Sequence, residues 1–103
     1  MATYVLVHGA WHGGWCWSKL VPLLEATRHR AIALDLPGHG NDKTPLAELS
    51  LDRYVACVST AIGTIDEPVV LVGHSLGGTV ISQTAEMHPD RILKLIYLCA
   101  FYS

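Results

Sequence analysis

Ser75 stands in the segment Gly73-His74-Ser75-Leu76-Gly77, directly after the apolar run 69–72. A serine held in a sharp turn from a strand into a helix can attack an acyl group, because the turn lifts its hydroxyl above the sheet and the helix N-terminus supplies positive potential. Such a turn is strained, so the residues two positions away must be small. The segment therefore predicts a nucleophilic serine, and an ordinary glycine-rich strand–helix turn is the alternative.

Acyl transfer also needs hydrogen-bond donors for the oxygen on which negative charge develops. One donor is predicted to be the backbone N–H of Leu76, the residue after the serine, and the second is expected from the loop after the first strand. The small residues Gly9 and Ala10 lie in that loop and let a substrate approach the backbone. We therefore predict the N–H of Ala10 as the second donor, with Trp11 N–H as the alternative. A tight turn that binds no ligand remains the other interpretation of this loop.

The elements that must position these groups follow from the apolar pattern. Four apolar runs are predicted to be strands, at residues 4–8, 30–36, 69–72 and 92–100. Three helices are predicted between them, the first around 20–24, the second starting from the N-cap Ser50, and the third running from the serine turn to His88. This alternation predicts the α/β fold class, with about four parallel strands in the order 2-1-3-4 and crossover helices.

Three segments together resemble a known family. They are VLVHGAWHGGW at 5–15, ALDLPGHG at 33–40 and the serine turn, and they resemble, in order and spacing, the α/β-hydrolase superfamily. The likeness is greatest to the plant methylesterase and hydroxynitrile-lyase group and its bacterial esterase relatives. It implies a serine carboxylic-ester hydrolase that acts on a small ester without a cofactor. Hydroxynitrile lyases of this group carry a hydroxyl residue where Gly9 stands, so the glycine favours ester hydrolysis over the lyase alternative.

The resemblance also implies roles for individual residues. Ser75 would be the nucleophile, Ala10 and Leu76 would supply the oxyanion hole, and the nucleophile elbow would include Gly73, His74 and Gly77. Family members are longer and place the acid and histidine of the triad in their second half, after a lid that follows the strand ending here near residue 100. Residues 1–103 are thus expected to be the N-terminal half of an α/β-hydrolase domain, a truncated fold with little turnover.

A second interpretation is a non-catalytic chain, either truncated or dependent on a partner. Its fourth strand, 92–100, would then be an exposed apolar edge through which the chain could self-associate. None of the histidines is expected to replace the missing base. His8 and His12 are expected to brace the loops near the serine, and His39 lies in the loop after the second strand.

Several other side chains have structural interpretations. Asp35 is expected to fix the turn at 37–40. Trp11, Trp15 and Trp17 either wall an acyl pocket or pack in a core or interface. The third helix is expected to turn one face inward, formed by Val80, Ile81, Thr84 and Met87.

Composition excludes several classes of protein. Of the 103 residues, 50% are hydrophobic and 16% charged, which excludes intrinsic disorder. The net charge of −2 comes without a basic stripe, which argues against nucleic-acid binding. The apolar runs are far shorter than the roughly 20 residues that span a bilayer, so no membrane association is expected. Neither a signal peptide nor a metal-binding cluster is recognisable. The three scattered cysteines are typical of reduced thiols in a cytoplasmic protein.

Overall fold

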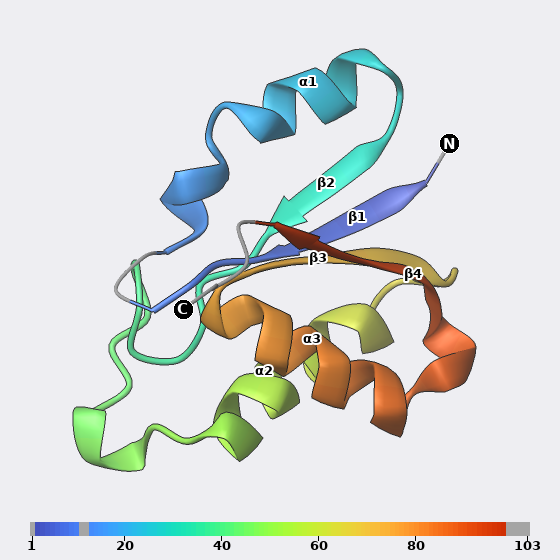
Figure 1. Cartoon of the computed structure of the whole chain (residues 1–103). Coiled ribbons are helices and arrows are strands. Elements are labelled where there is room, and N and C mark those ends of the chain that lie inside the picture. Colours follow the sequence, from blue (N-terminus) through green and yellow to red (C-terminus); the bar gives the residue numbers. More distant parts are fainter. Residues whose placement is uncertain (1, 11–12, 99–103) are drawn as a thin grey trace.

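A computed structural model describes residues 2–10 and 13–98, and its strands form one parallel sheet in the order β2-β1-β3-β4 (Figure 1). The strands are β1 (Thr3–Val7), β2 (Arg30–Ala33), β3 (Val69–His74) and β4 (Ile92–Leu98). The predicted α/β class and strand order are confirmed. Because β1 and β3 are neighbours in this order, the loop after β1 and the serine turn after β3 leave the same edge of the sheet.

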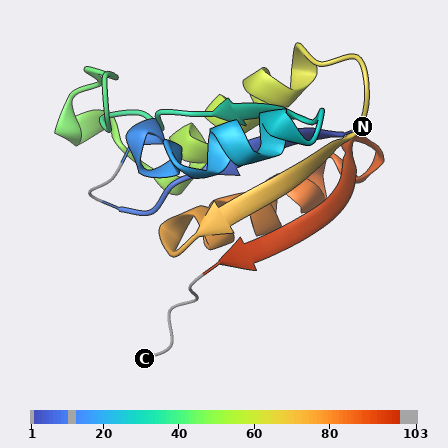
Figure 2. The same cartoon turned by 90° about the horizontal axis from the view of Figure 1, so that it is seen from above.

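Helices cover both faces of the sheet (Figures 1 and 2). Helices α2 (Leu51–Gly63) and α3 (Leu76–Met87) lie on one face, while α1 (Leu20–Ala26) and the 3₁₀ turn η1 (Gly14–Trp17) lie on the other. Two further 3₁₀ turns, η2 (Leu46–Glu48) and η3 (Pro89–Arg91), precede α2 and β4. None of the helices in the described part of the chain has the length and apolar character needed to cross a membrane.

The central strands are apolar along their whole length because both of their faces are buried. On β1, Val5 and Val7 pack toward α2 and α3, while Leu6 packs toward η1 and α1. Side chains of β3 alternate in the same way, with Leu71 on the first face and Val72 on the second. The helix-like spacing of residues on α2 likewise places Val55, Val58 and Ile62 in the core.

Strand β2 is shorter than predicted, because it ends at Ala33 and not at residue 36. The backbone N–H of Leu36 donates to Nε2 of His8, at 3.0 Å, and so leaves the strand ladder. The apolar run continues past the strand because Leu36 is itself fully buried in the core. The last two residues of the predicted fourth strand, 99 and 100, lie outside the described residues.

Three side chains lie in environments that the apolar pattern of the sequence does not predict. Met87 is 57% exposed, which corrects its predicted place on the inner face with Val80, Ile81 and Thr84. It is the last residue of α3 and borders a surface hollow between α2 and α3. Trp17 is buried in the core on the α1 face, whereas Trp15 is exposed at the end of the molecule that carries the serine turn.

Candidate active site

Ser75 has a backbone conformation that L-amino acids rarely adopt. Its φ is 57° and its ψ is −117°, between His74, which ends β3, and Leu76, which begins α3. A non-glycine residue at such angles costs on the order of 1–3 kcal/mol, and residues of this kind concentrate at functional sites. The Ser75 side chain does not cap α3. No capping hydrogen bond from the Ser75 hydroxyl to the backbone of α3 therefore offsets this strain.

Glycines beside Ser75 allow the helix to begin against the sheet. A Cβ atom on Gly77 would lie 2.2 Å from the carbonyl oxygen of Val7, at the end of β1. A Cβ on Gly73 would lie 2.6 Å from the carbonyl oxygen of Gly77. Both positions therefore exclude a side chain, so glycine at 73 and 77 is what allows α3 to begin this close to the sheet.

The loop after β1 touches this turn. A Cβ added to Gly9 would lie 3.1 Å from the Cβ of Ser75 and 3.0 Å from the carbonyl oxygen of His74. Ala10, the next residue, lines the same hollow as Leu76. The structure thus brings together the residues predicted to flank the substrate carbonyl, and Trp11, the alternative donor, lies outside the described residues.

Two hollows adjoin the turn. The larger one, named here the loop-side hollow, has a volume of about 440 Å³ and is lined by Ala10, Leu76, His39, Leu46, Leu49 and Tyr54, among others. The second, named here the hydroxyl hollow, has a volume of about 290 Å³ and includes Ser75, Thr79, Ser82 and Tyr97. Ser75 therefore borders the smaller hollow, which hydroxyl side chains line, whereas Leu76 lines the larger one.

His8 braces the loop after β1, as predicted. It is fully buried, its Nδ1–H donates to the carbonyl oxygen of Gly9 at 2.8 Å, and its Nε2 accepts from the N–H of Leu36 at 3.0 Å. Because Nε2 accepts this hydrogen bond, it carries no proton, and the ring proton is on Nδ1. His8 thereby fixes the backbone next to Ala10, and His12, given the same predicted role, lies outside the described residues.

Three other histidines are engaged with groups other than Ser75. His39 donates from Nδ1 to the carbonyl oxygen of Pro37 at 3.0 Å. His29 accepts from the N–H of Ala2 at 3.0 Å, and His88 pairs with the Ser59 hydroxyl at 3.1 Å. These contacts are those of bracing residues, as expected for histidines that do not act as the base.

Asp35 fixes the turn that follows β2, as predicted. Its carboxylate accepts from the N–H of Gly14 at 2.6 Å and from the N–H of Asn41 at 3.1 Å. A Cβ on Gly40, whose φ is 57°, would lie 2.1 Å from Oδ1 of Asp35. The carboxylate therefore ties the loop after β2 to the loop after β1.

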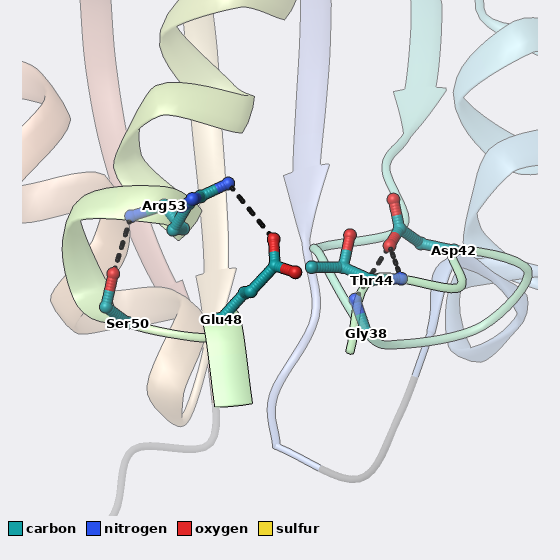
Figure 3. Close-up of polar contacts among 6 residues, drawn as sticks. All are labelled: Gly38, Asp42, Thr44, Glu48, Ser50 and Arg53. Atoms are coloured by element: carbon teal, nitrogen blue, oxygen red, sulfur yellow. Dashed lines mark hydrogen bonds and ion pairs between the residues drawn. The ribbon is translucent and has the colours of Figure 1, made fainter. Parts of the chain in front are cut away.

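Asp42 holds the backbone of the loop after β2, a role that was not predicted from the sequence. One oxygen of its carboxylate accepts from the N–H of Gly38 at 2.9 Å and from the N–H of Thr44 at 2.8 Å (Figure 3). The Gly38 bond is the main cause that lowers the pKa of Asp42 to about 2. An aspartate two residues before a backbone donor is a known turn signal, and Asp42-Lys43-Thr44 carries it.

The described cysteines are free thiols, not members of a disulfide. Cys16 and Cys57 are both partly buried, and burial raises the pKa of each thiol. Within residues 2–10 and 13–98, His, Cys, Asp and Glu side chains form no group that could hold a metal ion. Cys99 lies outside these residues.

Known proteins share both the sequence and the fold of this chain. Residues 4–103 match the sequence model described as the alpha/beta hydrolase family. Salicylic acid-binding protein 2 of Nicotiana tabacum is 46% identical over 101 residues, which are 95% of this chain and 39% of that protein. An alpha-hydroxynitrile lyase of Arabidopsis thaliana is 40% identical over 101 residues, with the same two coverages of 95% and 39%. The solved structure of a methylesterase protein from Arabidopsis has a TM-score of 0.91 at 33% identity, covering 100% of this chain and 45% of that one. The chain thus spans less than half the length of these relatives.

Proposed function

Because the chain belongs to the alpha/beta hydrolase family, we propose that Ser75 is the nucleophile of a serine carboxylic-ester hydrolase. The observation that carries the proposal is the strained turn at Ser75, with φ of 57°, between β3 and α3. The Ser75 hydroxyl would attack the carbonyl carbon of a small ester, expel the alcohol and form an acyl-enzyme that water then hydrolyses. The similarity to a methylesterase protein supports an ester as the substrate.

The oxyanion hole is proposed to consist of the N–H groups of Leu76 and Ala10. Leu76 is the first residue of α3, and the first N–H groups of a helix have no partner within it. Ala10 is supported by the contact of Gly9 with the serine turn and by the hollow that it shares with Leu76. Each such donor typically contributes 10²–10³-fold to the rate. Trp11 N–H is the alternative second donor.

Residues 1–103 are proposed to be the N-terminal half of the hydrolase domain. In the family, the acid and histidine of the triad come from the second half, and His8, His29, His39 and His88 here have other partners. Because no general base is then present, we expect the 103-residue chain to have little or no turnover. The free thiols of Cys16 and Cys57 support a cytoplasmic location.

Two alternatives remain, a non-catalytic chain and a hydroxynitrile lyase. From the family resemblance, lyase chemistry is expected to need a hydroxyl residue at position 9, where this chain has glycine, and one relative is named as an alpha-hydroxynitrile lyase. At Gly9 a Cβ would lie 3.0 Å from Nδ1 of His74 and 3.1 Å from Cβ of Ser75, which is tight for any side chain. A side chain that could hold the cyanohydrin oxygen therefore has little room at position 9, which favours ester hydrolysis over lyase activity. A cyanide-release assay with a cyanohydrin distinguishes the two reactions.

The test of the nucleophile uses a fluorophosphonate probe on the 103-residue chain together with a complementary C-terminal fragment that supplies the base. We expect one probe adduct, located on Ser75 by peptide mass spectrometry, and no adduct in Ser75→Ala. Ser18→Ala is the matched control, because Ser18 is an exposed serine outside both hollows and should leave labelling unchanged. Absence of an adduct on Ser75, even with a complementary C-terminal fragment present, would contradict the proposal and support a non-catalytic chain. Steady turnover of a chromogenic ester by the 103-residue chain alone, abolished by Ser75→Ala, would contradict the expectation of little or no turnover.

A further inference from the structure

The two sides of the sheet are covered to different extents. On the side of α1, the buried members of the core among the described residues are Leu6, Trp17, Val70 and Val72. Helix α1 itself contributes no buried residue, whereas α2 contributes three and α3 five on the other side. The layer formed by η1 and α1 is therefore the thinner of the two.

This thin layer does not extend over β3 and β4. Helix α1 packs against β2, and η1 packs against β1 and β2, so β3 and β4 carry no described helix on this side (Figure 2). The register pairs Val72 with Ile96 and His74 with Leu98, which places these β4 side chains on the α1 side. Ile96 is half-buried and Leu98 is 39% exposed. An apolar strip on β4 thus has no covering element in the described part of the chain.

Trp17 belongs to the thin layer and carries a polar atom that lacks a partner. Its side chain lies in the same cluster as Val70, Val72 and the half-buried Ile96, and it is only 5% exposed. Its Nε1–H is buried and finds no hydrogen-bond acceptor among the described residues. A buried indole N–H usually has an acceptor, because an unpaired one costs the free energy of its desolvation. The layer therefore lacks a hydrogen-bond acceptor at Trp17.

We propose that Trp17 is a docking residue, whose Nε1–H donates to an acceptor on the C-terminal part of the hydrolase domain when a segment of that part covers the α1 side of β3 and β4. The inference rests on the proposed function, in which residues 1–103 are the N-terminal half. The chain spans less than half the length of its relatives, so such a part exists in them. The buried donor and the apolar strip place its contact on this side of the sheet.

The chemistry of the strip defines the segment that fits it. Apolar side chains are needed against Ile96 and Leu98, and one oxygen acceptor is needed within reach of Trp17 Nε1. If the segment is a helix, its interior carbonyl groups are already bonded within the helix. The acceptor is then a side-chain oxygen or a carbonyl of the last helical turn.

The test removes the indole N–H without changing the shape of the ring. Benzothienylalanine has sulfur in place of the N–H, and the chain can be assembled chemically by ligation at Cys16 and Cys57. In the 103-residue chain alone, Trp17→benzothienylalanine should leave the urea midpoint equal or higher, because the donor it removes is unpaired. Trp15→benzothienylalanine is the matched control, since Trp15 is 62% exposed and should also leave the midpoint unchanged.

The second arm measures binding of a C-terminal part. The probe is the portion of salicylic acid-binding protein 2 of Nicotiana tabacum that follows its matched segment, refolded together with the chain. We expect Trp17→benzothienylalanine to raise the Kd of the complex about tenfold, because the acceptor loses its donor. The control at Trp15 should change the Kd less than twofold. In the unsubstituted chain, the NMR signal of the Trp17 indole N–H should move downfield in the complex.

Four outcomes would overturn the docking role. They are a lower urea midpoint for Trp17→benzothienylalanine in the chain alone, which would mean that the N–H already has an acceptor such as water, absence of a complex, a Kd that the substitution leaves unchanged, and a Trp17 signal that moves with the concentration of the chain alone. The last result would assign this side of the sheet to a second copy.

The two proposals fail in different ways. A complex in which Ser75 reacts with the fluorophosphonate while the Trp17 signal stays in place overturns the docking role and leaves the nucleophile assignment standing. A complex with the expected effect at Trp17 but no adduct on Ser75 overturns the nucleophile assignment and supports the docking role.

Discussion

At the scale of single residues, the ionised carboxylate of Asp42 binds two backbone N–H groups of the segment between β2 and α2. The ionised form accepts hydrogen bonds from the N–H groups of Gly38 and Thr44, which lowers the pKa of Asp42 from 3.8 to about 2. Because the pKa in the folded state lies below its ordinary value, the carboxylate stabilises the fold fully above pH about 4. That contribution is lost as the pH falls from about 3.8 to about 2.

This dependence predicts the behaviour of Asp42→Asn. The variant keeps the side-chain oxygen but not the charge, so its free energy of unfolding should be lower than that of the wild type at pH 5–7. The difference should shrink as the pH approaches 2. Urea unfolding of both proteins over this range measures the difference, and NMR titration of the Asp42 carboxyl carbon measures the pKa directly. A difference that is independent of pH would show that the charge of Asp42 does not hold the loop.

At the scale of elements, the start of α3 packs closely against the end of β1. The Cα of Gly77 lies so near the end of β1 that a methyl group there would overlap the carbonyl oxygen of Val7, at 2.2 Å. Gly77→Ala should therefore push α3 away from the sheet and lower the free energy of unfolding by roughly 1–3 kcal/mol. It should also reduce labelling of Ser75, because the turn that presents the hydroxyl would move.

Gly63→Ala is the matched control for that substitution. Gly63 ends α2, and a Cβ there would meet no atom within 4 Å. The change should leave stability equal or raise it by up to about 1 kcal/mol, because alanine favours the helix and restricts the unfolded chain. Urea midpoints of the two variants test the pair. Equal effects at the two positions would refute the packing argument.

The same junction shows what the sequence could and could not predict. Glycines around Ser75, the apolar runs and the alternation of strands and helices predicted the sheet order and the serine turn, because these features follow from local backbone limits and burial. The end of β2 could not be predicted, because Leu36 leaves the strand to bind His8, 28 residues away in the chain. The role of Asp42 and the hollow beside Leu76 also depend on loops that meet only in the folded chain.

At the scale of the whole molecule, β4 is an edge strand with exposed apolar side chains. Leu93 is 63% exposed and Leu98 39% exposed, and the outer side of β4 pairs with no strand of the described part of the chain. Unpaired strand edges of this kind favour association between chains. We propose that the 103-residue chain self-associates through β4, with an average mass in solution that rises with protein concentration.

Sedimentation velocity over a concentration series tests this association. Replacing Leu93 and Leu98 together by lysine should shift the chain toward monomer, because the added charges must be buried or repel one another at a paired edge. Leu23→Lys on α1 is the control, since Leu23 is 66% exposed on a different element. A wild-type chain that stays monomeric at all concentrations, or a control that disperses it equally well, would contradict association through β4.

The conformation of Ser75 has a consequence for inheritance as well as for chemistry. Glycine would adopt a φ of 57° without strain, so a serine at this position makes the native fold less stable than a glycine would. Most lineages tolerate such a loss only while the side chain serves a purpose, because stabilising changes are otherwise easily gained. On the proposed function, a gene copy no longer selected for a nucleophilic serine should therefore drift toward glycine at residue 75 early. The residue at that one codon would then distinguish descendants that keep the proposed nucleophile from those that keep only the fold.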